Sequence, residues 1–472
     1  MVDEQIIQER DNAGRILQIR VREDGITTST KDVSGHGAGQ KGWLYVVDLM
    51  TRMFLPVGYP SSVSPDYLRY QILNALQAFC NSLASLISSR AILQGFGVGD
   101  PTASPTKALL LTVLQDVCSR LTTILSAHLV GSSLSPEAKT FRLLADVLND
   151  TAVILDTFSP AFNAVPIPGL RVMSLCLSAV FKSLCGIAAG GSKASITMHF
   201  ATPLTGKGDV GDLNAKDSSK ETVLALFGML LGTLIVPYLT TSWTTYSALF
   251  LLVGLHLAIN YFGVRGLVLR SLNRQRLGIT WISYQKSRGS TAPTPSQTAA
   301  LERIFEYPGT IRDPLTGQIQ GYCTIGSSFS SILRRPVPSG LIDIFREERY
   351  IIWFDHSCLR LAMNASTSPN LHGLKRVHIA LKEGYTNDDL VKAWIQAVEI
   401  CSIVGENVDA LGVVRTSYQS VTRQLPQFME SLRLSGWLTA DCPIMIGVPH
   451  AVVTTVTSGG TRSGKGEDKK SR

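Results

Sequence analysis

The chain has 472 residues, of which 45% are apolar and only 17% are charged, and its formal net charge is +8. This low charge, with a mean hydropathy of +0.17, is more typical of a protein that contacts a membrane than of an ordinary soluble protein. Its eight cysteines form no CxxC pair, so we expect reduced core thiols and exclude a disulfide framework.

Residues 1–50 are predicted to form a flexible N-terminal region with one short β-hairpin. The first residues, MVDEQIIQER, are acidic and contain no apolar core, so no signal peptide is expected. The glycine-rich stretch STKDVSGHGAGQKG is not followed by the Lys-Ser/Thr pair of a phosphate-binding loop, and is interpreted as flexible.

Residues 51–282 are predicted to form a helical membrane domain. The first helix starts at Ser64 as N-cap with Pro65 at its first position, and its uncharged part, 70–89, is as long as a bilayer is thick. Three more helices are expected, at about 105–130, 135–158 and 169–196. The third is amphipathic, and the fourth is rich in small residues.

The run from Thr222 to Val264 contains no charged residue and is interrupted by PYLTTSWTTY. Its length and this interruption predict two membrane-spanning helices joined by a short turn. A capping box formed by Ser218 and Glu221 predicts that the hairpin starts at about Ser219. The alternative is a buried helical pair in a large soluble protein. Four arginines after the hairpin predict that both of its ends are cytoplasmic: Arg265, Arg270, Arg274 and Arg276.

The remaining chain has the composition of a soluble domain. Residues 283–299 are predicted as a linker, 300–450 as a soluble α/β domain that we expect to be cytoplasmic, and 451–472 as a disordered basic tail. The stretches RYIIWFD, CLRLAM and RVHIALK predict strands, and TNDDLVKAWIQAVEICSIV and LPQFMESLRLSGWL predict helices. Thr386 and Asp389 are the predicted N-cap pair of the first of these helices. The predicted fold class is therefore mainly α, a multi-helix transmembrane bundle followed by a small soluble α/β domain.

Six segments in the same order resemble the root UVB sensitive family, which carries the vitamin B6 photoprotection and homoeostasis domain. They are FLPVGYPSSVSPDYLRYQILNALQAF, GVGDPTAS, KTFRLLADVLNDTA, GIAAGGSKA, DLNAKDSSKETV and RGLVLRSLNRQRL. The resemblance covers about residues 54–277 and implies a membrane protein with a role in vitamin B6 balance, without an assigned biochemical activity. The chain departs from the family pattern at Leu213, Asn214, Ser218 and Lys220.

Polar residues inside predicted membrane helices are expensive unless they face a partner or a watery cavity. We therefore predict that three groups of polar residues line a polar cavity or ligand site. The first group is Arg142, Asp146, Asn149 and Asp150, the second is Asp116 and Arg120, and the third is Asp212, Asn214 and Lys216. The alternatives are a water-facing helix surface for the first group, a local ion pair for the second, and pairing with Arg265 or Arg270 for the third.

The stretch Gly190, Gly191, Ser192 and Lys193 is a candidate anion site, for example for pyridoxal phosphate, with close helix packing as the alternative. A pyridoxal phosphate Schiff base needs a lysine, and Lys182, Lys193 and Lys216 are formal candidates. No strand–loop–helix setting supports any of them. The eight histidines have no metal-binding spacing, and no basic-aromatic stretch indicates nucleic-acid binding.

The function that the sequence supports best is a non-enzymatic role in vitamin B6 homoeostasis or small-molecule transport, in an integral membrane protein. The first alternative is a membrane-anchored scaffold that recruits partners through its C-terminal domain. The second is a pyridoxal-phosphate-dependent enzyme. Expected partners are membrane lipid, a small-molecule vitamer, and a protein partner or homologue bound by the C-terminal domain.

Overall fold

The computed structural model describes three strands within residues 4–32, and residues 49–454 with gaps at 98–103, 205–207, 333–337, 339, 356–374, 404–408 and 440–443. The chain divides into two units. The first contains Met1–Asn273, Thr294–Glu306 and Met445–Gly447, and the second contains Arg274–Pro293, Tyr307–Ile444 and Val448–Arg472. Each unit is described by itself.

The N-terminal strands form a separate antiparallel sheet in the order β1-β2-β3. They are β1 (Glu4–Arg10), β2 (Ile16–Arg22) and β3 (Ser29–Asp32). The predicted hairpin is confirmed by β1 and β2, which pair from Glu4 opposite Arg22 to Arg10 opposite Ile16. The prediction of a flexible glycine-rich stretch is wrong for Ser29–Asp32, which form β3, and the prediction of a disordered tail is wrong for Val452–Val453, which form β8. The rest of the glycine-rich stretch, 33–42, and the tail from residue 455 lie outside the described residues.

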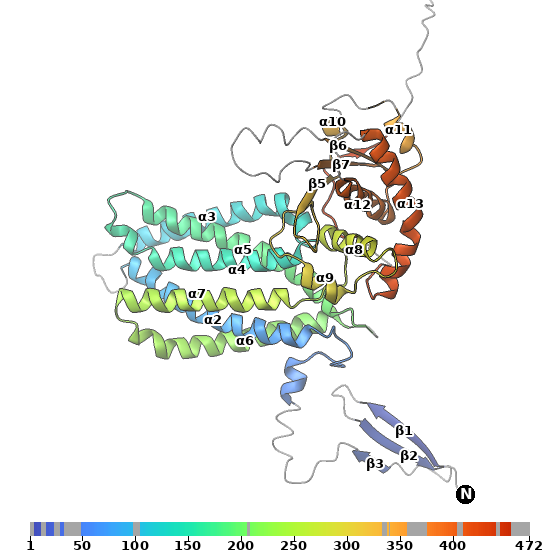
Figure 1. Ribbon diagram of the computed structural model, residues 1–472. Coiled ribbons are helices and arrows are strands. Elements are labelled where there is room, and N and C mark those ends of the chain that lie inside the picture. Colours follow the sequence, from blue (N-terminus) through green and yellow to red (C-terminus); the bar gives the residue numbers. More distant parts are fainter. Residues whose placement is uncertain are drawn as a thin grey trace, which may run out of the picture. The chain divides into compact units, whose positions relative to one another are not determined.

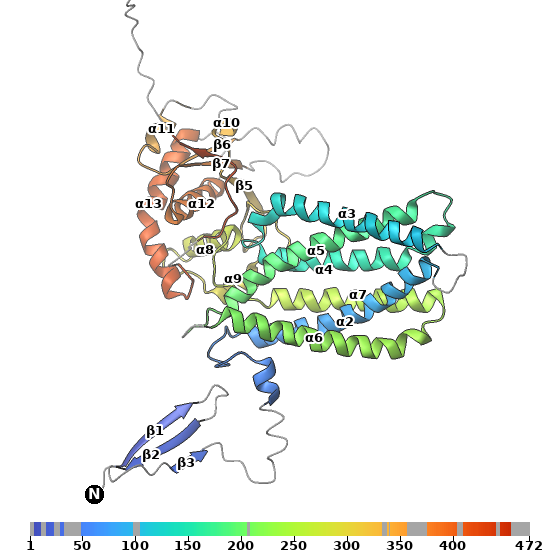
Figure 2. The ribbon, with the colours of Figure 1, turned by 180° about the vertical axis from the view of Figure 1, so that it is seen from behind.

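In the described part between residues 67 and 265, the first unit is a bundle of six long helices (Figures 1 and 2). Consecutive helices run in opposite directions, and the closest packing is between α4 and α5, between α3 and α5, and between α2 and both α6 and α7. The mainly helical prediction is confirmed by α2 (Tyr67–Gly95), α3 (Pro105–Val130), α4 (Ala138–Phe158), α5 (Leu170–Phe200), α6 (Val210–Ile235) and α7 (Ser242–Arg265). Short 3-10 turns follow α3, α4 and α6 at Gly131–Ser133, Ala161–Ala164 and Val236–Tyr238.

The start of α2 differs slightly from the prediction, because Asp66 and not Ser64 is its N-cap. The Ser64 hydroxyl donates to the Asp66 carboxylate at 2.6 Å. His199 Nε2 lies 3.1 Å from the same carboxylate, and the Val268 amide donates to it at 2.8 Å. Burial opposes the charge of Asp66, but the hydrogen bonds from His199, Ser64 and Val268 outweigh it and lower its pKa. Asp66 therefore ties together α2, α5 and the chain after α7.

The two predicted helices of the charge-free run are present as α6 and α7, but the predicted start of the first is wrong. Helix α6 begins at Val210, and its N-cap is Asp209, whose side chain accepts from the Gly211 amide at 2.7 Å. Ser218 and Glu221 are therefore interior helical residues and form no capping box. Helix α2 packs against both α6 and α7.

Four helical stretches have the length and apolar composition to cross a bilayer: Pro105–Ser133, Leu170–Phe200, Val210–Tyr238 and Ser242–Arg265. They contain α3, α5, α6 and α7. The other two bundle helices, α2 and α4, are more polar and carry buried polar side chains such as Gln77, Asp146 and Asp150. The polar helices thus pack among apolar ones, since α2 contacts α4, α6 and α7, and α4 contacts α5 and α7.

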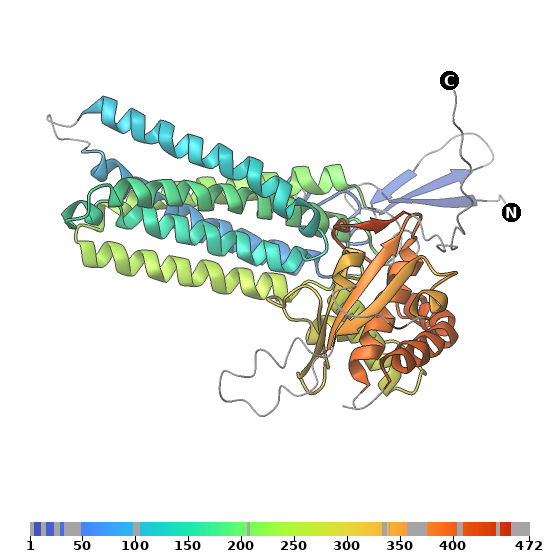
Figure 3. The same ribbon diagram turned by 90° about the horizontal axis from the view of Figure 1, so that it is seen from above.

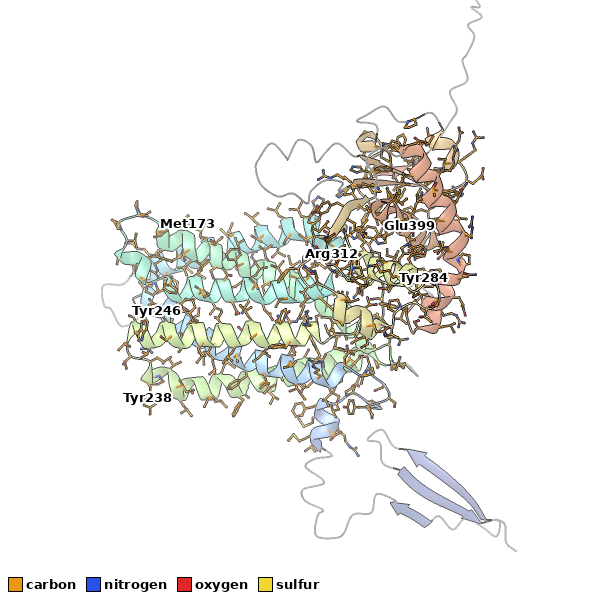
Figure 4. All side chains as sticks on the ribbon, viewed as in Figure 1. Met173, Tyr238, Tyr246, Tyr284, Arg312 and Glu399 are labelled. Atoms are coloured by element: carbon orange, nitrogen blue, oxygen red, sulfur yellow. The ribbon has the colours of Figure 1, made fainter. Side chains whose placement is uncertain are left out.

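Two apolar clusters stabilise the bundle at different positions along its length. At the end where α2 and α6 begin, Tyr67 and Tyr70 pack on Phe200 with ring centroids 5.2 and 5.3 Å apart. Further along, Ala84, Val153, Leu249 and Val253 form a second cluster. Met173, Tyr238 and Tyr246 lie together at the opposite end of the bundle (Figure 4). This end therefore carries the aromatic side chains expected at a membrane–water interface.

The second unit is a five-stranded mixed sheet with helices. The strand order is β4-β5-β7-β6, and β8 pairs with β7. Strand β7 runs parallel to β5 and β8 and antiparallel to β6. The strands are β4 (Thr310–Arg312), β5 (Ile319–Ile325), β6 (Tyr350–Asp355), β7 (Lys375–Lys382) and β8 (Val452–Val453). The helices of this unit are α8 (Arg274–Lys286), α10 (Phe329–Ile332), α11 (Leu341–Ile344), α12 (Asn387–Ser402) and α13 (Ala410–Leu434).

The core of the second unit lies where α12 packs on the sheet, with the fully buried Trp394 and Ile379 among its residues (Figure 3). The predicted strands 349–355 and 376–382 are confirmed by β6 and β7, whereas 358–363 lies outside the described residues. The predicted cap of α12 is confirmed by the Thr386–Asp389 capping box. The predicted start of the last helix is wrong, because α13 begins at Ala410 and includes Pro426. Within the predicted linker, α8 continues to Lys286, and α9 (Pro295–Leu301) begins at Pro295.

Candidate functional site

A polar cavity of about 360 Å³ lies inside the first unit, among α2, α4, α5, α6 and α7. It extends from the first apolar cluster, whose Tyr70 and Phe200 line it, toward the second cluster, so it occupies the half of the bundle where α2 and α6 begin. Its polar and ionisable lining residues are Tyr70, Asn74, Gln77, Asn81, Ser82, Arg142, Asp146, Asn149, Cys185, Lys193, Thr197, Asp217, Glu221 and His256.

Helix α4 provides the central charges of the cavity, because Arg142, Asp146 and Asn149 lie at i, i+4 and i+7 and share one face. Arg142 Nη1 lies 3.2 Å from Asp146 Oδ1. The other two nitrogens of its guanidinium are also bonded, since Nη2 donates to Asn74 at 3.0 Å and Nε donates to the Tyr70 hydroxyl at 3.2 Å. The arginine is therefore held in one orientation from two helices.

The Asp146 carboxylate is buried and accepts three side-chain hydrogen bonds. Besides Arg142, the Asn260 amide donates to it at 2.5 Å, and the Gln77 amide donates to it as well. These donors come from α7, α2 and α4 itself. Satisfying a buried carboxylate in this way makes its burial tolerable and fixes its position in the cavity wall.

Asp150 lies one turn beyond Asp146 and faces His256 of α7. The His256 Nδ1 atom lies 2.8 Å from Asp150 Oδ2, and its Nε2 atom lies 3.9 Å from Asp146 Oδ2. Both His256 and Asp150 are at most 2% exposed. The imidazole thus stands between two carboxylates and also lines the cavity.

A second ion pair joins α5 to α6 across the cavity. Lys193 Nζ lies 3.1 Å from both carboxylate oxygens of Glu221. Asn74 donates to the same carboxylate at 3.1 Å. Asn74 therefore accepts from Arg142 with its oxygen and donates to Glu221 with its nitrogen, which links the two ion pairs into one network.

Of the residues predicted from sequence, the structure brings five together at the cavity: Arg142, Asp146, Asn149, Gly190 and Lys193. Asp150 lies directly behind this lining through His256. Gly190 to Lys193 are interior residues of α5, so their backbone amides donate to carbonyl groups of the same helix. Gly191 lies against Leu134, and the Ser192 hydroxyl donates to the Ala188 carbonyl at 2.6 Å.

The other predicted residues lie elsewhere. Asp116 and Arg120 form an exposed ion pair of 3.0 Å on α3. Asp212 accepts from the Val57 amide at 2.8 Å, and Lys216 donates to the Arg52 carbonyl. Asn214 is 3.4 Å from the Thr197 hydroxyl.

Several lining residues were missed by the sequence analysis, in particular His256, Glu221, Asn74 and Gln77. A signal for them exists in the spacing. His256 and Asn260 lie at i and i+4 within an uncharged run, and Asn74, Gln77 and Asn81 form a polar stripe in α2 at i, i+3 and i+7. In the part of the chain that the structure describes, no group of three or more metal-binding side chains is present.

Comparisons with known proteins identify one family model and several relatives of the same family. Residues 40–288, more than half of the chain, match the family model of the vitamin B6 photo-protection and homoeostasis domain. "RUS family member 1" of Dictyostelium discoideum is 34% identical over 261 residues, which is 55% of this chain and 48% of that protein. This chain thus spans about half the length of that relative.

Two plant relatives match over more of their length. "Protein root UVB sensitive 3" of Arabidopsis thaliana is 26% identical over 400 residues, 82% of each chain. "Protein root UVB sensitive 2, chloroplastic" of the same plant is 23% identical over 400 residues, 84% of this chain and 83% of that protein. No solved structure matches the chain.

Proposed function

This chain belongs to the root UVB sensitive family, with its vitamin B6 photo-protection and homoeostasis domain, and from that premise we propose that it binds a B6 vitamer in the cavity of its helical unit and carries it across a membrane. The observation that carries this proposal is the polar cavity inside a bundle with four bilayer-length apolar helices. Transporters commonly bind their substrates near the bilayer midplane, where polar groups are otherwise costly.

The arrangement of the helices supports membrane insertion. Leu230 of α6, Leu251 of α7 and Ile124 of α3 are 58, 65 and 67% exposed, although water solvates such side chains poorly. The polar helices α2 and α4 lie among these apolar helices and direct their polar residues at the cavity. In this proposal all six helices cross the bilayer, and the end that carries Arg265 and Arg270 faces the cytoplasm.

The size and charge of the cavity favour an unphosphorylated vitamer. A volume of about 360 Å³ is at the small end of ligand sites, as suits a single-ring compound. Each cation of the lining already has a carboxylate partner, Asp146 for Arg142 and Glu221 for Lys193. A phosphate dianion would have to compete with those carboxylates, whereas a pyridine ring with hydroxyl groups can exchange single hydrogen bonds with Asn74, Asn149 or Lys193.

His256 is the proposed site of a proton that moves with the ligand. Its neighbours are Asp150 and Asp146, and Arg142 supplies one positive charge for these two carboxylates. A proton on His256 balances the cluster, and its loss leaves a net negative charge beside the cavity. Ligand binding and protonation are then coupled through one buried charge.

Calorimetric titration of the purified protein in lipid nanodiscs tests the binding step. We expect pyridoxine to bind more tightly than pyridoxal phosphate, and Asp146→Asn to weaken pyridoxine binding by about tenfold or more, as for a lost charged hydrogen bond. Asp343→Asn is the control, because its ion pair with Arg346 is exposed on α11 of the second unit. Melting curves show whether each variant is folded. Absence of binding by any vitamer contradicts the proposal.

A further inference from the structure

Helix α3 carries an ion pair on its outside. Asp116 and Arg120 are bonded to each other at 3.0 Å, and their side chains are 61 and 77% exposed. Both residues lie near the middle of the helix, at least about 15 Å from either end at 1.5 Å per residue. This inference rests on the membrane insertion proposed above, in which the pair stands at the depth of the lipid hydrocarbon.

Charged side chains at that depth are unfavourable when they face lipid, and in membrane proteins they turn toward a partner or a watery cavity. Asp116 and Arg120 are not solvated by the cavity, because neither residue lines it. Their side chains point away from the described part of the bundle, so the partner must come from outside it.

The residues of α3 divide into three faces. The face toward α5 is marked by Gln115, which donates to the Leu175 carbonyl at 3.2 Å, and by Ser119, whose hydroxyl is 2.6 Å from that of Ser183. At 100° per residue, a second face collects large apolar side chains that suit lipid. These are Leu110, Leu114, Val117, Leu121, Ile124 and Leu125, all exposed.

The third face has a different composition. It contains the ion pair of Asp116 and Arg120 together with Thr112, Thr123 and Ala127, and with one large apolar residue, Leu109, near the start of the helix, all of them exposed. We call it the polar face of α3. Helices that associate in membranes use this composition, since small residues permit close approach and polar side chains bond across the interface. Figure 3 shows α3, drawn in cyan, along the edge of the bundle.

We propose that the polar face of α3 is the interface of a symmetric dimer and that a second copy of this chain covers it. The argument is charge complementarity. Asp116 and Arg120 are one helical turn apart, so two parallel α3 helices related by a twofold axis place Asp116 of each copy beside Arg120 of the other. Both cross-pairs form together, and the charges that one copy exposes are neutralised by the same residues of the second.

Cysteine crosslinking in membranes tests the geometry. Thr123→Cys lies on the polar face, and Leu125→Cys, on the lipid face of the same helical turn, is its matched control. Under mild oxidation we expect a covalent homodimer for Thr123→Cys above the level of the wild type, which already contains Cys118 on α3. Equal crosslinking at both positions, or a covalent product with a different protein in place of the homodimer, overturns the proposal.

Charge reversal tests the chemistry. Asp116→Arg or Arg120→Asp alone places like charges across the interface, so we expect the dimer to weaken by about tenfold or more in nanodiscs. The double reversal restores complementarity and should restore the dimer. A wild type that is monomeric at all concentrations, or single reversals that leave the dimer intact, overturns the inference. A monomer that binds pyridoxine refutes only the dimer, and a dimer that binds no vitamer refutes only the proposed function.

Discussion

His256 and Asp150 face each other inside the helical unit, with Nδ1 2.8 Å from the carboxylate, although they are 106 residues apart in the chain. We predict that this pair makes transport depend on the pH gradient. His256→Asn keeps a polar side chain at this position of α7 but cannot take up a proton. Uptake into proteoliposomes should then proceed at one rate with and without an imposed gradient, whereas wild-type uptake should change severalfold.

The control for this variant is thermal stability, because the loss of a buried partner also destabilises the fold. A variant that melts at nearly the wild-type temperature and still responds to the gradient as the wild type does would refute the role of His256. Asp150→Asn should abolish the response in the same way, since Asp150 is the acceptor of the Nδ1 atom in this pair.

Lys193 should contribute to ligand affinity. Its ammonium group lines the cavity and is held by Glu221, so Lys193→Gln removes a charged donor without adding bulk. We predict about tenfold weaker pyridoxine binding. Lys182→Gln on the same helix is the matched control, since Lys182 pairs with Asp156 and does not line the cavity. Equal affinity of both variants and the wild type would mean that Lys193 does not contact the ligand.

Local patterns predicted much of the fold. The uncharged run and its Pro-Thr interruption predicted α6 and α7, and Thr386 with Asp389 predicted the cap of α12. The start of α6 was mispredicted because Ser218 and Glu221 satisfy the capping pattern, while the helix continues back to Asp209, an equally good cap. Choosing between two valid caps requires tertiary contacts, here between Lys193 and Glu221 from a different helix.

The site was predictable in part. Arg142, Asp146 and Asn149 share a face by helical spacing alone, so their grouping followed from the sequence. The pairing of Asp150 with His256 depends on how α4 packs against α7, which no local pattern encodes. For the same reason, nothing in the spacing of Asp116 and Arg120 distinguished a cavity from an exposed helix face.

Gly232 of α6 allows close packing against α2. A Cβ atom at Gly232 would lie 2.3 Å from Leu86 Cδ1, the flexible end of that side chain, so Gly232→Ala must displace it. We predict a loss of about 1 kcal/mol in the free energy of unfolding, at the low end for an overpacked core. At Gly254 of α7 no atom lies within 4 Å of an added Cβ, so Gly254→Ala should be neutral or stabilise by up to about 1 kcal/mol through helix propensity. Similar melting temperatures of the two variants would contradict this packing.

Glu399 should make the second unit sensitive to pH. Burial raises the pKa of this carboxyl above its ordinary value of 4.5, although Trp281 and Gln285 both donate to it, at 2.9 and 3.2 Å. Figure 4 shows Glu399 and Tyr284 in this unit. Because the folded state holds the proton more tightly than the unfolded chain, the stability from Glu399 is present at acid pH and is lost as the pH rises through the raised pKa.

Glu399→Gln keeps an acceptor for both donors but does not titrate. The melting temperature of the variant minus that of the wild type should therefore increase between about pH 4.5 and 7. A difference in melting temperature that stays constant or decreases over this pH range would show that burial does not destabilise the charged carboxylate of Glu399.

Uptake of labelled pyridoxine into proteoliposomes tests the central claim most directly. The account predicts that vesicles with the wild-type protein accumulate pyridoxine well above protein-free vesicles, that Asp146→Asn reduces uptake to the protein-free level, and that Asp343→Asn leaves it unchanged. Wild-type vesicles that take up no more pyridoxine than protein-free vesicles, with the protein folded and inserted, would contradict the account.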